Sequence, residues 1–384
     1  MKLIAKTLFG LETLLEQELK ELGASKINVL NRAIEFESDL ETLYRIAIES
    51  RVALRVLLPF ANYKARGEDD FYKKAQRIDW SQYLTNDKTF AINSTTHGEQ
   101  FTHSQYAGLK LKDAIVDQFR EKTGARPSVN TSSPDVLINL HISNIEVSIS
   151  LDATGEPLNK RGYRMETNEA PINEILAAAM IQLSGWDDIT PFLDPMTGSG
   201  TIAIEAAMKA RNIAPGLNRT FAFQKWSDYD PQLFEKVKAE AQAKVTTSDV
   251  EIVARDFNMG CLGIARRNAV RAGVEDMIIF DCVDFMKSDP IADSAMIIMN
   301  PPYGERLDEK IDLGQLYHDI GFRLKHSYPT HKVWVITSNL DAMKRIGLKP
   351  DTRVKLYNGS LECRFNEYTL FKGKRIDQLK NAEN

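Results

Sequence analysis

The sequence lacks several features that would assign it to a specialised class of protein. Its 384 residues include only three cysteines, Cys261, Cys282 and Cys363, and they form no CxxC pair. We therefore expect neither a disulfide framework nor a metal site. No run of about 18 apolar residues occurs, which excludes a membrane-spanning helix, and the first residues lack the apolar core of a signal peptide. These absences fit a protein of the reducing cytoplasm.

The sequence also lacks an excess of charge of one sign. It has 49 basic and 53 acidic residues, for a net charge of −4. Composition therefore does not indicate a nucleic-acid-binding protein, and any surface for RNA or DNA has to be local. What is present is an ordinary globular mixture, with 43% hydrophobic and 27% charged residues. The length corresponds to two or three domains.

The first sixty residues predict a small α+β unit. Leucines at helical spacing end before Gly23, which occupies the position of a helix-terminating glycine. Ile34 and Phe36 then alternate with glutamates, as in a half-buried strand.

Residues 61–165 predict a second unit. A helical apolar stripe over 111–119 precedes two strands, 136–141 and 145–151. The unit ends in a basic and aromatic stretch over 158–164.

From residue 166 onward, strands and helices alternate. This rhythm predicts a doubly wound, mostly parallel α/β sheet of the Rossmann-like class. Near the end, Asn358-Gly359 separates two strand-like segments, which is a strong signal for a β-hairpin. We therefore expect an α/β domain over residues 166–384 that ends in an antiparallel hairpin. Strands are expected at 190–193, 251–254, 277–280 and 295–299, and helices at 172–184, 201–211 and 261–271.

A glycine-containing loop, Asp194 to Thr201, follows the first strand of this domain and opens a helix. At such a turn, glycines let the backbone approach a ligand closely, and the helix N-terminus offers N–H groups to an anion. The loop matches neither GxGxxG nor a P-loop. A turn without a ligand remains the alternative.

Two acids stand at the ends of later strands. Asp256 follows the second strand, where an acid commonly accepts from ribose hydroxyls. Asp284 follows the third strand, and for this residue a solvated loop carboxylate remains the alternative.

The second motif is Asn300-Pro301-Pro302-Tyr303, directly after the fourth strand. Consecutive prolines fix φ and lack N–H donors, so the loop offers carbonyl acceptors. The amide of Asn300 adds another. An exocyclic amino group on a nucleobase presents two donors, which Asn300 and the Pro301 carbonyl can accept, while Tyr303 can stack on the base. A turn that merely ends the strand is the alternative.

Together the motifs resemble the class I S-adenosylmethionine-dependent methyltransferases. Residues 194–201 look like the cofactor loop of that family, and residues 300–303 like the motif of its amino-group methyltransferases. The longer run 300–307, and the run 158–164 followed by 169–172, are similar to the THUMP-domain rRNA guanine-N2 methyltransferases. One departure is Thr197, where relatives often carry cysteine.

The resemblance implies a fold and a set of site residues. It implies an α+β ferredoxin-like unit over residues 1–60, a THUMP domain over 61–165 and the methyltransferase domain over 166–384. It implies Asn300, Pro301, Pro302 and Tyr303 as catalytic residues. The implied cofactor contacts are Asp194, Met196, Thr197, Gly198, Ser199, Gly200, Asp256 (ribose), Phe257 (an adenine face), Asp284 (the adenine amino group) and Asn300. Lys110, Lys112, Arg120, Lys160, Arg161 and Arg164 are candidates for RNA phosphate contacts.

The activity implied is methyl transfer from S-adenosylmethionine to the exocyclic N2 of a guanosine in 23S rRNA, without a metal. Some relatives carry a second, C-terminal methyltransferase domain, and we do not expect its activity here. Three alternatives stay open. A tRNA guanine-N2 methyltransferase shares both parts, whereas a DNA adenine-N6 methyltransferase shares only the catalytic motif. A non-catalytic RNA-binding or assembly protein is expected to have lost Asn300 or the glycine loop. The sequence gives no signal for an oligomeric state.

Overall fold

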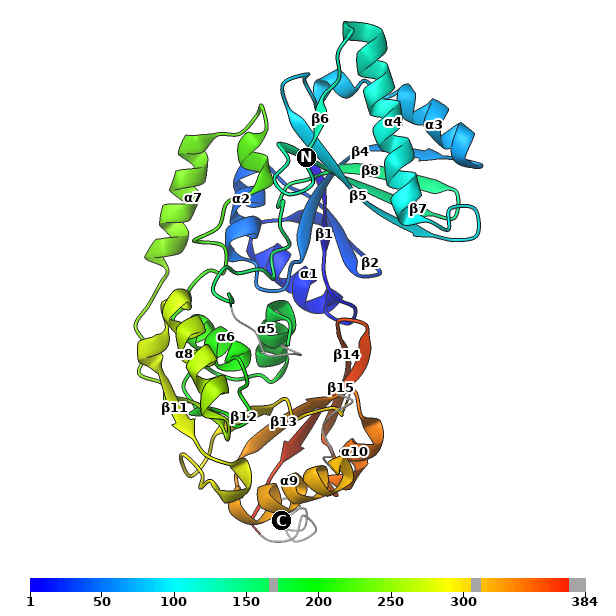
Figure 1. Ribbon diagram of the computed structural model, residues 1–384. Helices are drawn as coiled ribbons and strands as arrows, with labels where there is room; N and C mark the ends of the chain where they lie inside the picture. Colours follow the sequence, from blue (N-terminus) through cyan, green and yellow to red (C-terminus); the bar gives the residue numbers. More distant parts are fainter. Residues whose placement is uncertain (166–171, 305–311, 373–384) are drawn as a thin grey trace.

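The computed structural model describes residues 1–165, 172–304 and 312–372. Two of the sequence segments quoted for the resemblance, 169–171 and 305–307, lie outside these residues. The chain forms two sheets, one in the N-terminal part and one in the C-terminal part (Figure 1). Among the described residues, no helix is both long and apolar enough to cross a membrane.

The N-terminal sheet has eight strands in the order β2-β3-β1-β4-β8-β7-β5-β6. Its first part comprises β1 (Lys2–Lys6), α1 (Glu12–Glu21), β2 (Ser25–Leu30), β3 (Ala33–Glu37), α2 (Leu40–Glu49) and β4 (Arg55–Lys64). Its second part comprises α3 (Glu68–Gln76), β5 (Thr89–His97), α4 (Ser104–Thr123), β6 (Ser128–Val129), β7 (Val136–Ser143) and β8 (Glu146–Asp152). Caps fix the helix ends. For example, the Asp39 side chain accepts a hydrogen bond from the Thr42 backbone N–H at the start of α2.

The two N-terminal units share this one sheet, because a single strand pairs with both. The first residues of β4 pair with β1, and from Leu57 to Lys64 the same strand pairs with β8. The strand therefore runs through residue 60, where the sequence places the end of the first unit. Because hydrogen-bonded strands continue from one unit into the other, the sheet fixes the position of the two units relative to each other.

The C-terminal sheet has the order β11-β10-β9-β12-β13-β15-β14. All its pairs are parallel except those of β15 with β13 and β14. The expected Rossmann-like domain with a terminal hairpin is therefore confirmed. The strand order reverses between β9 and β12, and in open α/β sheets ligands bind at such a switch point, outside the carboxyl ends of the strands.

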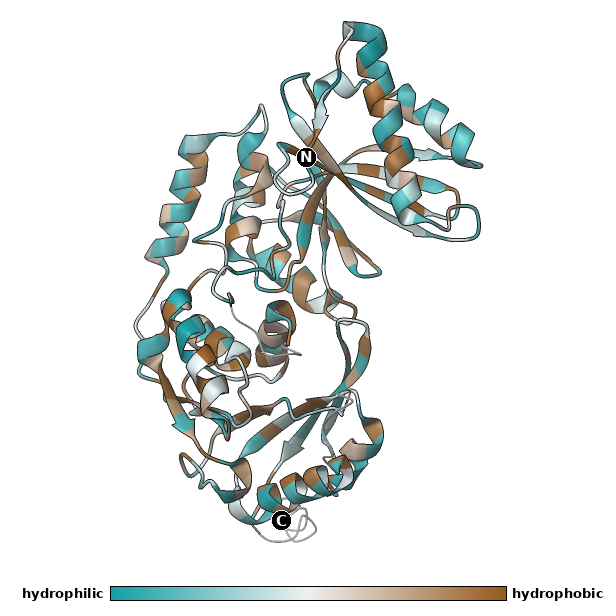
Figure 2. Ribbon diagram, in the orientation of Figure 1, coloured by the Kyte–Doolittle hydropathy of each residue, from teal (hydrophilic) through white to brown (hydrophobic). Residues whose placement is uncertain are grey.

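The elements of this domain have the following bounds. The strands are β9 (Phe192–Asp194), β10 (Ile252–Asp256), β11 (Ile278–Cys282), β12 (Met296–Met299), β13 (Lys332–Thr337), β14 (Thr352–Asn358) and β15 (Leu361–Thr369). The helices are α5 (Glu174–Leu183), α6 (Thr201–Ala210), α7 (Pro231–Ala243), α8 (Met259–Ala272), α9 (Leu313–Ser327) and α10 (Leu340–Arg345). Helices α4 and α7 carry both hydrophilic and hydrophobic residues along their length, as expected of helices with one buried face (Figure 2).

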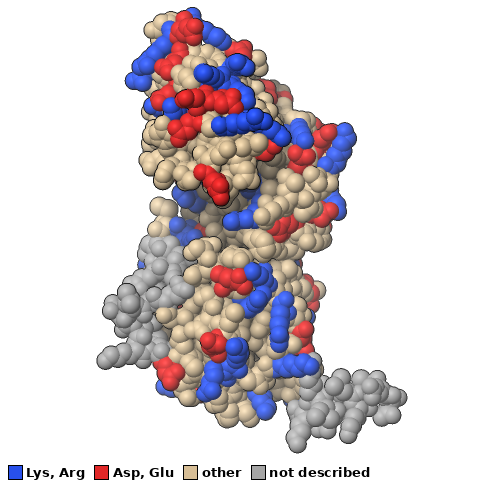
Figure 3. Space-filling model, turned by 90° about the vertical axis from the view of Figure 1, so that its right-hand side faces the viewer, with Lys and Arg blue, Asp and Glu red and all other residues tan. Residues whose placement is uncertain are grey.

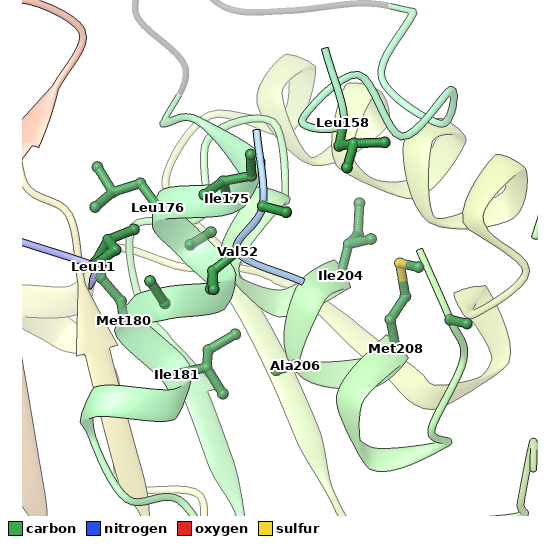
Figure 4. Packing of buried hydrophobic residues seen from close by; sticks show 14 of the residues in the cluster. Leu11, Val52, Leu158, Ile175, Leu176, Met180, Ile181, Ile204, Ala206 and Met208 are labelled. Carbon is green, nitrogen blue, oxygen red and sulfur yellow. The ribbon is translucent and has the colours of Figure 1, made fainter. Parts of the chain in front are cut away.

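The hydrophobic cores divide the chain differently from the sheets. One core joins the first N-terminal unit to the C-terminal α/β domain, so that Leu11 and Val52 pack in one cluster with Leu176 of α5 and Ile204 of α6 (Figure 4). The part built from α3, α4 and the strands beside them has a core of its own. The first N-terminal unit and the C-terminal α/β domain therefore bury their apolar faces against each other.

Candidate active site

The loop between β9 and α6 is held in place by the two elements beside it. The Thr197 N–H donates to the Arg255 carbonyl (2.8 Å), and the Gly198 N–H donates to Asp256 Oδ2 (2.9 Å). From α8, the buried side chain of Asn268 donates to the Ser199 carbonyl (3.1 Å). The sequence analysis did not select Asn268. Its only signal was a polar residue at an inward position of an amphipathic helix.

Asp194 ends β9 with its side chain fully buried. Its Oδ2 accepts from the Thr197 hydroxyl (2.8 Å), so the residue that replaces cysteine in this loop has a contact of its own. Its Oδ1 makes no hydrogen bond within the described part of the chain. Burial raises the pKa of Asp194 to about 7, against the opposing effect of the Thr197 hydroxyl. A buried carboxylate oxygen without a partner fits a cationic donor, such as the ammonium of a bound amino acid.

The two glycines of the loop adopt positive φ, +54° at Gly198 and +84° at Gly200. At Gly200 the tight neighbour is protein, because an added Cβ would lie 2.8 Å from the Cβ of Ala265 on α8. This glycine therefore allows α6 and α8 to pack closely, and its expected contact with a cofactor stays a prediction. Met196 is partly buried against the neighbouring core cluster.

The residues expected to hold a nucleoside lie at the ends of the next two strands. Asp256 is buried, and besides Gly198 it accepts from the Asn258 N–H (2.9 Å). Each of its oxygens keeps a second lone pair for a hydroxyl. Phe257 is 78% exposed, so its ring is accessible to an adenine. Asp284 is half-buried and accepts from the Met286 N–H (3.0 Å).

The Asn300–Tyr303 loop follows β12, the strand next to β9. The Tyr303 hydroxyl donates to Asn300 Oδ1, and its ring packs partly against the core. Burial raises the pKa of Tyr303 well above its usual value, so the hydroxyl keeps its proton. Within the described residues, no group donates a hydrogen bond to the Pro301 carbonyl. The loop therefore presents the Pro301 carbonyl and the second lone pair of Asn300 Oδ1 as acceptors.

The six basic residues expected to contact RNA fall into two groups. Four lie on the surface. Lys110, on α4, lies 5.8 Å from the ring centres of Tyr72 and Tyr106. The other three pair with acids on their own segments: Lys112 with Asp113, Arg120 with Asp117 and Lys160 with Glu156. On the face in Figure 3, basic and acidic side chains are interspersed over the upper lobe, without a patch of one sign.

The expectation for Arg161 and Arg164 is wrong, because both side chains are used inside the protein. Arg161 is 6% exposed and pairs with Glu205 of α6 (3.4 Å), which also accepts from the Tyr163 hydroxyl (3.0 Å). Arg164 pairs with the buried Glu174 of α5 (2.9 Å). A buried ion pair leaves no charge for a phosphate, so these arginines attach the linker to the methyltransferase domain.

Among the described residues, no group of three or more His, Cys, Asp or Glu side chains is placed to hold a metal ion.

Family models match a ferredoxin-like domain of the RlmL type at residues 2–57, a THUMP domain at 65–152 and an RMKL-like methyltransferase domain at 161–367. The ribosomal RNA large subunit methyltransferase K/L of Shewanella sp. (strain MR-4) is 39% identical over 367 residues, which are 94% of this chain and 52% of that protein. The chain thus spans about half the length of the curated relatives it matches.

Solved structures match over almost the whole chain. SMU.472, a candidate methyltransferase complexed with SAH, is 31% identical with a TM-score of 0.86, and the match covers 97% of this chain and 99% of that one. A protein from Listeria monocytogenes, described as a predicted N6-adenine-specific DNA methylase, is 32% identical with a TM-score of 0.84, covering 96% and 95%. With more than half of its residues matched by one family model, the chain belongs to the RMKL-like methyltransferase family, and a THUMP domain and a ferredoxin-like domain precede its catalytic part.

Proposed function

We propose that this protein transfers a methyl group from S-adenosylmethionine to the exocyclic N2 of a guanosine in 23S rRNA. The observation that carries the proposal is the adjacency of two loops at the switch point of the sheet. The glycine loop after β9 and the Asn300–Tyr303 loop after β12 stand at the carboxyl ends of neighbouring parallel strands. A methyl donor in the first loop and an amino group in the second would therefore be close together.

The residues of the first loop fit S-adenosylmethionine in three ways. The unpartnered Asp194 Oδ1 suits the ammonium of the methionine end. Asp256 has lone pairs that can accept hydrogen bonds from the ribose hydroxyls. The exposed Phe257 ring can cover the adenine, and Asp284 can accept a hydrogen bond from the adenine amino group. The SAH held by the similar structure supports this choice. The sulfonium of the donor supplies an activated methyl group, so the protein mainly has to position the reactants.

The residues of the second loop fit an amino group. The Pro301 carbonyl and Asn300 Oδ1 can accept hydrogen bonds from the two N–H groups of the amino group, and so fix its nitrogen for in-line attack. As the bond from N2 to the methyl carbon forms, the bond from sulfur to that carbon breaks, and the positively charged nitrogen then releases its proton to water. The guanine has to leave its stack to enter this site, which suits a flipped or single-stranded base.

The N-terminal part would supply the affinity for RNA. The THUMP domain and the names of the relatives support rRNA as the partner and the bacterial cytoplasm as the compartment. We keep the expected units, 1–60, 61–165 and 166–384, with β4 shared between the first two. Lys110, Lys112, Arg120 and Lys160 remain the proposed phosphate contacts, so RNA affinity should fall as salt rises, with a slope that decreases as these cations are removed.

The test is single-turnover transfer of labelled methyl to rRNA, with total tRNA and DNA as competing substrates, followed by digestion to nucleosides. We expect N2-methylguanosine from rRNA. Asn300→Ala should lose about 10²- to 10³-fold in rate, the scale for removing one positioned polar group, and should still bind cofactor. N6-methyladenosine as the product, or preference for tRNA or DNA, would overturn the proposed substrate. An Asn300→Ala rate close to wild type would overturn the role of Asn300.

A further inference from the structure

Some backbone carbonyls of the Asn300–Tyr303 loop accept hydrogen bonds from the rest of the protein. The loop contains two prolines, so its backbone is rich in acceptors and poor in donors. The carbonyl of Pro302 lies 3.2 Å from the hydroxyl of Tyr317, and the carbonyl of Tyr303 accepts from Asn339 Nδ2 (3.4 Å). Both partners come from outside the loop, Tyr317 from α9 and Asn339 from the turn before α10.

The Tyr317 hydroxyl has a second hydrogen-bond partner besides the Pro302 carbonyl. Its hydroxyl oxygen also lies 2.7 Å from Thr337 Oγ1 at the end of β13. The Tyr317 hydroxyl is the donor in both contacts, so its one hydrogen is shared between Thr337 Oγ1 and the Pro302 carbonyl. Thr337 Oγ1 in turn accepts from the backbone N–H of Asn339 (3.1 Å). A chain of hydrogen bonds therefore runs from the start of α10 through β13 and α9 to the loop.

The hydroxyl groups in this series of hydrogen bonds are buried. Tyr317 and Thr337 are both fully buried, so no solvent competes for their hydroxyls. Burial also raises the pKa of Tyr317, which keeps its hydroxyl protonated as a donor. The Tyr317 ring is packed in the core formed under α9 and β13, so the hydroxyl is rigidly placed. Asn339 is fixed as well, because its Oδ1 caps α10 by accepting from the Ala342 N–H (2.9 Å).

We propose that Tyr317, together with Asn339, is a positioning residue for methyl transfer: it fixes the Pro302 carbonyl and so aims the neighbouring Pro301 carbonyl at the amino group. The proposal rests on the proposed function, because it assumes that an amino group enters this loop. The two carbonyls after Pro301 are engaged by the protein, whereas within the described residues no group donates a hydrogen bond to the Pro301 carbonyl. Tyr317 itself has its hydroxyl turned to the backbone and does not touch the substrate.

The first variant is Tyr317→Phe, which removes the hydroxyl and keeps the ring. We expect the single-turnover rate of methyl transfer to fall about 10- to 100-fold, the scale for a small displacement of a reacting group. The dissociation constants for S-adenosylmethionine and for rRNA should stay within about twofold of wild type. The lost hydrogen bond orients the loop carbonyl and contacts neither the cofactor nor the RNA.

The matched control is Tyr368→Phe. Tyr368 is also buried in the same core cluster, and its hydroxyl contacts Met343. It lies level with Val333 at the opposite end of β13 from Thr337. This variant loses a buried hydroxyl without touching the loop, so it should transfer methyl at the wild-type rate even if its stability falls.

Asn339→Asp gives a second test that does not depend on a buried tyrosine. The aspartate keeps the capping acceptor for α10 but loses the Nδ2 donor to Tyr303. We expect the same pattern, a slower transfer step with unchanged binding and unchanged melting temperature. Equal rates for Tyr317→Phe and Tyr368→Phe, or a wild-type rate for Asn339→Asp, would overturn the positioning role. The rate is measured as methyl on whichever base the wild type modifies, so a product other than N2-methylguanosine would count against the proposed function alone.

Discussion

The hydroxyl of Tyr303 donates a hydrogen bond to Oδ1 of Asn300, within the loop that both residues help to form. An asparagine amide can present either its oxygen or its nitrogen in a given direction. Because a hydroxyl donor requires an oxygen beside it, the contact sets the orientation of the Asn300 amide. Tyr303 is therefore placed to act through its hydroxyl as well as through its ring.

We accordingly expect Tyr303→Phe to lower the rate of the transfer step by about fivefold, which corresponds to the loss of one hydrogen bond worth about 1 kcal/mol. A stacking role alone would need only the ring and would leave the rate of Tyr303→Phe near that of wild type. Tyr303→Ala should lose more, because it removes both. Single-turnover rates at saturating cofactor provide the measurement, and a Tyr303→Phe rate equal to wild type would return the hydroxyl to a minor role.

The pKa of Asp194, about 7 in the free protein, predicts a pH dependence of cofactor binding. An ammonium requires the ionised carboxylate, so S-adenosylmethionine affinity should fall by up to about tenfold per pH unit below 7 and level off above it. Asp194→Asn should bind more weakly and show a flatter profile between pH 5.5 and 8. Isothermal titration calorimetry measures both. A wild-type affinity that is constant through this range would contradict the assignment of Asp194.

The same group affects the stability of the free protein in the opposite direction. Because the pKa of Asp194 is raised on folding, the folded state keeps a proton that the unfolded chain releases between about pH 4 and 7. Its contribution to stability is therefore complete below about pH 4 and is lost as the pH rises through 7. Asp194→Asn carries no such proton, so its melting temperature relative to wild type should increase over this range.

The two loops could be predicted from the sequence because the residues that define each are neighbours along the chain. Asp194 to Gly200 and Asn300 to Tyr303 each follow an apolar strand, and the chemistry of glycine, proline and asparagine is readable without a fold. Alternating strands and helices also predict the doubly wound sheet, whereas the strand order that makes the two loops neighbours comes from the structure.

What the sequence could not give depends on contacts between distant residues. Tyr317 stands in the apolar pattern of a helix, where an aromatic residue is expected to be core, and its partner Thr337 is 20 residues away. The strand β4 pairs on both sides, which no pattern within 55–64 indicates. A structure is needed wherever a polar group is satisfied by a partner that its own segment does not contain.

Gly200 offers a test of why the glycine loop has its composition. Gly200→Ala should lower the free energy of unfolding by about 2–4 kcal/mol, because positive φ costs about 1 kcal/mol and the contact with Ala265 adds overpacking. Gly273→Ala is the control, since Gly273 has φ +72° and nothing within 4 Å of an added Cβ. It should lose only the backbone part. Denaturant unfolding measures both, and equal losses would show that packing against α8 is not what selects glycine at position 200.

The pair Arg161–Glu205 decides between an internal and an RNA-binding role for the basic linker. Arg161→Met would leave Glu205 buried without its cation, which typically costs about 3–5 kcal/mol. The loss should appear as a lower free energy of unfolding, because α6 and the ferredoxin-like part both depend on this contact: Arg161 also donates to the Arg51 carbonyl (2.6 Å). RNA affinity, measured below the melting transition, should stay unchanged. The neighbouring Lys160 is the matched control, since its side chain is 60% exposed and pairs with Glu156 at the surface. Lys160→Met should leave stability near wild type and should weaken rRNA binding, with a shallower dependence on salt.

A stable Arg161→Met variant with weakened, less salt-dependent RNA binding would reverse this assignment and put Arg161 back among the phosphate contacts.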